Sequence, residues 1–66
     1  MGKVRRGGYL FIWWTGDHEP RHVHVFDSKQ RLLGRVAIET KAPLDAWIPT
    51  KKAVEIITQL QREGRL

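Results

Sequence analysis

The sequence has no cysteine, so neither disulfide bonds nor thiolate metal ligands contribute to this protein. Its longest apolar run, residues 9–14, is too short for a membrane span or for the core of a signal peptide. A cytoplasmic protein without a membrane segment is therefore expected. A chain of 66 residues makes one small domain, and such a domain buries only about 60% of the surface that its unfolded form exposes. Contact with a second copy or with a partner chain is expected to add stability.

The sequence also lacks a phosphate-binding glycine loop, a dinucleotide fingerprint and a nucleophile elbow, so no cofactor is expected. What it has is positive charge, with a formal net charge of +5. Residues 1–8 carry three basic and no acidic side chains, and residues 51–66 carry four basic and two acidic ones. This excess attracts a polyanion such as RNA or an acidic partner, and a merely solvated basic surface is the alternative.

Three strands are predicted from the pattern of side chains. Residues 9–14 are apolar and aromatic throughout, which favours a strand that is buried on both faces. Residues 21–27 and 31–39 alternate β-branched with polar side chains, and a turn at residues 27–30 connects them. Residues 44–48 form either a short fourth strand or irregular structure. Residues 1–8 are interpreted as a basic arm.

A helix is predicted after Pro49, with Thr50 as its N-cap and Gly64 as its stop signal. One side of this segment is apolar at helical spacing, and the opposite side is polar. The expected fold is α+β: a three- or four-stranded antiparallel sheet with one C-terminal helix packed on one face, in the order β-β-β-(β)-α.

All three histidines of the chain fall within residues 17–25, whose sequence is DHEPRHVHV. Histidine gains or loses a proton near neutral pH and is the commonest metal ligand, so this cluster is the leading functional candidate. His22 and His24 are two residues apart on the predicted second strand and therefore lie on the same face. If Val23 and Val25 face the helix, both histidines lie on the uncovered face of the sheet. His18, in the preceding loop, is close enough in sequence to bend back toward them.

Three interpretations of the histidines remain open. In the first, one neutral and one protonated imidazole carry out acid–base chemistry on RNA while an arginine stabilises charge on the phosphate. In the second, two or three histidines bind a metal ion together with Asp17 or Glu19. In the third, the histidines line a subunit interface and have a structural role.

The same residues resemble a known family. The run at 17–25 is similar to the core motif His-x-Pro-Pro-His-x-His-Val of small bacterial proteins grouped as domain of unknown function 4160. Residues 38–40 and the segment 48–53 also resemble that family's pattern, and the similarity extends from about Tyr9 to Leu66. Arg21 stands where the family usually has a second proline. The resemblance implies a stand-alone cytoplasmic domain that is often encoded beside another small protein in a toxin–antitoxin arrangement.

The function predicted from the sequence is a toxin-type component of a toxin–antitoxin pair that acts on RNA. In this hypothesis the proton transfers involve His22, His24 and His18, and no metal or cofactor takes part. Substrate binding is assigned to Arg21 and Arg35 near the histidines and to Lys51 and Lys52 in the first helical turn. Whether the chain is an enzyme stays open, and a non-enzymatic module that binds protein or nucleic acid is the alternative.

Overall fold

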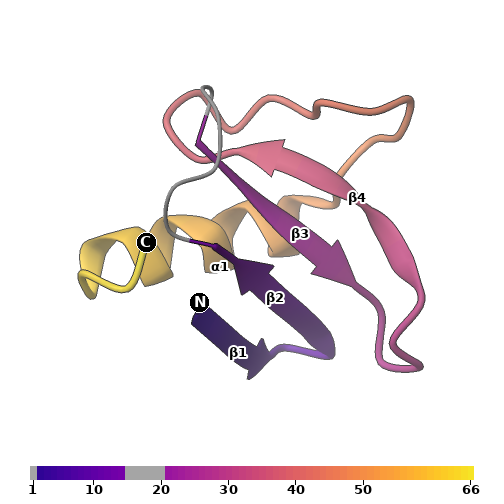
Figure 1. Ribbon diagram of the computed structural model, residues 1–66, viewed down its shortest axis with the longest axis horizontal. Coiled ribbons are helices and arrows are strands. Elements are labelled where there is room, and N and C mark those ends of the chain that lie inside the picture. Colours follow the sequence, from indigo (N-terminus) through magenta and orange to yellow (C-terminus); the bar gives the residue numbers. More distant parts are fainter. Residues whose placement is uncertain (1, 15–20) are drawn as a thin grey trace.

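The computed structural model describes residues 2–14 and 21–66 (Figure 1). It contains an antiparallel sheet in the order β1-β2-β3-β4, followed by a C-terminal helix. The predicted α+β fold, an antiparallel sheet with one C-terminal helix, is confirmed. The elements are β1 (Gly2–Arg6), β2 (Tyr9–Trp13), β3 (His22–Phe26), β4 (Leu32–Ala37) and α1 (Lys51–Arg62).

The N-terminal residues form the edge strand β1 instead of the predicted arm. A two-residue turn at Gly7 and Gly8 joins β1 to β2, with φ angles of 64° and 86°. Two positive φ angles in succession are what a type I′ hairpin turn requires, and glycine adopts them at little cost. The fourth strand therefore precedes the predicted three. Residues 44–48 are not a strand, although Pro43 makes an isolated bridge with Val36.

The core lies between one face of the sheet and α1. Val23 and Val25 of β3 are both 0% exposed, and Val25 lies opposite Phe11 of β2. Alternation along a strand sends these side chains to the same face, which is the face that the helix covers. The contiguous cluster consists of Val4, Phe11, Val23, Val25, Val36, Ile38, Ile56, Ile57 and Leu60.

The helix begins and ends where the sequence predicts. The hydroxyl of Thr50 accepts a hydrogen bond from the amide of Ala53 at 3.1 Å, which satisfies one of the free amides of the first turn. Gly64 follows the C-cap with a φ of 76°, a left-handed conformation that ends the helix. No helix in residues 2–14 and 21–66 is long and apolar enough to cross a membrane.

The segment after β4 folds back along the sheet and brings Trp47 over Gly34. The indole Nε1 of Trp47 donates a hydrogen bond to the carbonyl of Arg35 at 3.0 Å. A Cβ atom at Gly34 would lie 2.2 Å from that nitrogen, so only glycine allows the ring to approach this closely. This contact holds the segment beside the outer edge of β4.

Candidate functional site

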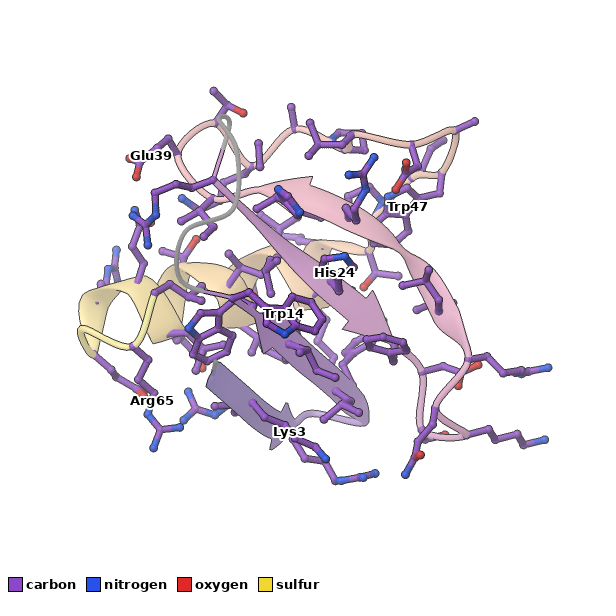
Figure 2. The ribbon with its side chains drawn as sticks, in the orientation of Figure 1. Lys3, Trp14, His24, Glu39, Trp47 and Arg65 are labelled. Atoms are coloured by element: carbon purple, nitrogen blue, oxygen red, sulfur yellow. The ribbon has the colours of Figure 1, made fainter. Side chains whose placement is uncertain are left out.

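The uncovered face of the sheet carries His22 and His24. Their neighbours Val23 and Val25 are fully buried under the helix, so the two histidines project from the opposite side. Figure 2 shows His24 on the side of the sheet away from α1. Both histidines are half-buried. The predicted parity of this strand, with the valines inward and the imidazoles outward, is confirmed.

The two imidazoles and the indole of Trp14 form a continuous row of rings. The ring centroids of His22 and His24 are 5.1 Å apart, and the ring planes are tilted by 58°. The Trp14 and His24 centroids are 4.8 Å apart, and their planes meet at 88°. The Nδ1 atom of His24 is buried. Trp14 is 42% exposed and presents the accessible end of the row.

Strand β1 adds two cations to the same face, and neither was predicted from the sequence to belong to the site. Lys3 lies opposite Ile12, which in turn lies opposite His24. Arg5 lies opposite Leu10 on the next row of that face. Both cationic side chains are exposed. The signal that could have placed them is Gly7-Gly8, because two glycines between alternating segments predict a hairpin.

Arg35 shares the open face with His24 but is held by a carboxylate. Its Nε and Nη2 atoms donate to Asp45 at 3.2 and 3.0 Å, and its backbone amide donates to the same carboxylate at 3.0 Å. The side-chain hydrogen bonds from Arg35 are the main cause that lowers the pKa of Asp45, and the charge of His24 also contributes. Arg35 therefore acts as one half of an ion pair, with its positive charge largely offset.

The other sequence-predicted substrate contacts lie in different places. Arg21 immediately precedes β3, with its guanidinium half-exposed and 3.7 Å from Glu39. Lys51 and Lys52 are exposed in the first turn of α1, which packs on the opposite face of the sheet. Arg21 is therefore close to His22 along the chain, whereas the structure does not bring the two lysines to the histidine face.

The third predicted catalytic histidine, His18, lies outside the described residues, as do Asp17 and Glu19. Within residues 2–14 and 21–66, no three histidine or carboxylate side chains gather in a way that could hold a metal ion. A shallow hollow of about 270 Å³ lies along the helix between Val54 and Arg62, away from the histidines. The histidine row is thus a surface feature of an open sheet.

Comparisons of the chain with protein-family models, with curated proteins and with solved structures give no match. The resemblance of residues 17–25 to the family named above stays a prediction. The geometry of the uncovered face is therefore the basis for the function proposed below.

Proposed function

We propose that this protein acts on single-stranded RNA through the uncovered face of its sheet, with His22 and His24 sharing the proton transfers. The observation that carries the proposal is the pair of imidazoles on that face, with ring centroids 5.1 Å apart. At this separation both rings can contact a single phosphodiester group from the same side. Such a pair needs no nucleophile from the protein, because the RNA supplies its own 2′-hydroxyl.

Binding of the RNA depends on stacking and on charge. Open sheet faces that carry aromatic side chains bind unpaired bases by stacking, and each stacked base contributes about 1–3 kcal/mol. Trp14 is the exposed ring on this face, and Lys3 lies on the same row of cross-strand neighbours as His24. Asp45 holds Arg35 by three hydrogen bonds, whereas Arg21 makes only a 3.7 Å ion pair with Glu39 and is half-exposed. We therefore assign the phosphate contact to Arg21. His18 is proposed to assist.

The proposed reaction is a transesterification within the RNA. A neutral imidazole removes the proton from a 2′-hydroxyl, and the 2′-oxygen attacks the adjacent phosphorus. The bond from phosphorus to the 5′-oxygen breaks, and the protonated imidazole donates its proton to that oxygen. The products are a 2′,3′-cyclic phosphate and a 5′-hydroxyl. The arginine stabilises the charge that builds on the non-bridging phosphate oxygens.

In its biological setting, we propose a toxin-type component of a bacterial toxin–antitoxin pair in the cytoplasm, with a second small protein as its partner. The resemblance of residues 17–25 supports this part of the proposal. The small size of the domain supports it as well, because contact with a partner would add buried surface.

The test is cleavage of a labelled single-stranded RNA by untagged protein in the presence of EDTA. We expect a 2′,3′-cyclic phosphate product, no cleavage of the all-deoxy oligonucleotide, and a bell-shaped dependence of rate on pH. The double variant His22→Ala/His24→Ala should lose activity by at least about 100-fold. Glu55→Gln, on the exposed side of the helix, is the matched control and should cleave like the wild type.

Loss of cleavage must be separated from loss of folding, so circular dichroism of the double variant is measured in parallel. Equal cleavage by the wild type and a folded double variant would rule out the histidine mechanism. Induced expression provides a second readout, because growth arrest should require His22 and His24.

A non-enzymatic binding module is the second candidate, and one observation favours it. The histidine rings are packed against each other and against Trp14, and the Nδ1 of His24 is buried. Rings packed in this way suit a contact surface as well as a reactive one. RNA binding that is lost in Trp14→Ala, without cleavage by the wild type, would establish this function instead.

A further inference from the structure

The two outer edges of the sheet differ in whether another segment lies against them. Beyond β4, the amide of Ala37 donates to the carbonyl of Ala42 at 2.9 Å, and the amide of Leu44 donates to the carbonyl of Arg35 at 3.0 Å. Pro43, which has no amide hydrogen, sits between these two bonds and bridges to Val36. A returning segment that contains proline is a known way to protect an edge strand.

The edge of β1 has no such cover within the described chain. Among residues 2–14 and 21–66, no strand pairs with the outer side of β1, and Figure 1 shows no labelled element beyond it. The type I′ turn joins Arg6 to Tyr9 as the first hydrogen-bonded pair of the hairpin. Hydrogen-bonded and non-hydrogen-bonded pairs alternate along an antiparallel ladder. Lys3 and Arg5 belong to non-hydrogen-bonded pairs with β2, so their amides and carbonyls point outward. These outward groups can hydrogen-bond to an added strand.

The side chains on this edge define what kind of strand fits. Lys3 and Arg5 are exposed, and no acidic side chain in the described part of the chain forms an ion pair with either. Arg6, by contrast, is bound to Glu63 of the helix at 2.8 Å. Two unpaired cations beside outward main-chain groups match an extended segment with an acidic residue at every second position.

A second copy of this chain is a poor occupant of the same edge. Antiparallel pairing of β1 with β1 of another copy would place lysine and arginine side chains near like charges, which is unfavourable. Cations on an edge strand oppose self-pairing in this way, and the same cations attract an acidic strand.

We infer that the outer edge of β1 is a docking site for an acidic, extended peptide segment of a partner protein, which adds to the sheet as a further strand. Main-chain hydrogen bonds from Lys3 and Arg5 hold the segment, and their side chains select acidic residues. This inference shares Lys3 with the proposed RNA-binding face, but it uses neither of the proposed catalytic histidines, so its test can fail while RNA cleavage is retained.

The test uses a fluorescein-labelled hexapeptide that alternates glutamate with threonine, and anisotropy measures its binding to the full chain. Arg5→Ala removes the charge but keeps the amide, so affinity should fall by at most about fivefold. Arg5→Pro also removes the outward amide hydrogen while leaving the β1–β2 hydrogen bonds. Its affinity should therefore be about two- to tenfold lower than that of Arg5→Ala. Lys29→Ala, a cation in the β3–β4 turn, is the matched control and should bind like the wild type.

Amide hydrogen exchange of the wild-type protein gives a readout that does not depend on a proline variant folding. Addition of the glutamate peptide should slow exchange at Lys3 and Arg5, and a peptide that alternates lysine with threonine should not. The inference is wrong if Arg5→Pro, shown to be folded, binds like Arg5→Ala, or if the two amides exchange at an unchanged rate. It is also wrong if these amides are already slowed by self-association, or if a uridine hexanucleotide binds and the peptide does not. None of these outcomes affects the RNA cleavage test.

Discussion

The indole of Trp14 meets the imidazole of His24 edge-on, with centroids 4.8 Å apart and planes at 88°. Trp14 follows the end of β2, and His24 lies at the centre of β3. The contact therefore links the protonation of a candidate catalytic group to an indole whose fluorescence can be measured.

We predict that the fluorescence of Trp14 falls when His24 gains a proton, because a neighbouring imidazolium quenches an indole. His24→Phe should abolish this pH dependence and keep an aromatic contact. Trp14→Phe should remove it too, since the remaining tryptophans lie on the side that packs against the core. A transition that persists in both variants would mean that the two rings do not lie in contact.

Replacement of Gly34 by alanine should destabilise the protein by about 1–3 kcal/mol, because the added Cβ would lie 2.2 Å from Nε1 of Trp47 and force the ring away. Urea denaturation measures the change. The same substitution in a Trp47→Ala background should cost less, since the clashing ring is gone and only the strain of an alanine at the φ of Gly34, 157°, remains. Equal effects in the two backgrounds would contradict the close approach of Trp47 to β4.

Loss of the helix N-cap should be measurable in thermal unfolding. The hydroxyl of Thr50 accepts from the amide of Ala53 and lies 2.7 Å from the hydroxyl of Tyr9. Thr50→Ala should lower stability by about 1 kcal/mol, a fall of about 4–8 °C in Tm for a domain of this size. Thr50→Ser keeps the acceptor and should recover most of the loss, whereas no recovery would show that the methyl group matters instead.

The stability of the fold should decline in acid. Hydrogen bonds lower the pKa of Asp27, Asp45 and Glu63, in each case mainly bonds from arginine. A carboxyl group with a lowered folded pKa stabilises the protein above its unfolded pKa, and this contribution is lost as pH falls through the folded value. These three groups should therefore change Tm little between pH 7 and 5. Below about pH 4, Tm should fall.

Asp45→Asn isolates one of these three groups. The asparagine keeps an oxygen that can accept from the amide of Arg35 but loses the charge. We expect lower stability at pH 7 and a smaller further loss in acid, measured as Tm at each pH and compared at low and high salt. A variant with the same acid dependence as the wild type would show that the Arg35 ion pair does not contribute to it.

The face on which the histidines lie could be predicted from the sequence, because alternation along a strand is a local property. Valines at positions 23 and 25 require a buried face, and the intervening histidine must then point away from it. The helix was predictable for the same reason, since Thr50, Gly64 and the apolar spacing between them act within the segment itself.

The partners of the cations were not predictable, because they come from segments that are distant in sequence. Arg35 was expected to bind substrate, yet ten positions later Asp45 returns beside it when Trp47 packs over Gly34. Lys51 and Lys52 are local features of a helix start, but only packing decides that this helix covers the face opposite the histidines.

The strand parity, the helix and its cap were thus determined by the sequence alone, because backbone geometry relates neighbouring residues directly. The pairing of β1 with β2, which adds Lys3 and Arg5 to the histidine face, was signalled locally by Gly7-Gly8. Tertiary structure decided the neutralisation of Arg35 and the face of the sheet that α1 covers. These features depend on which distant surfaces bury apolar area together, and no local pattern encodes that choice.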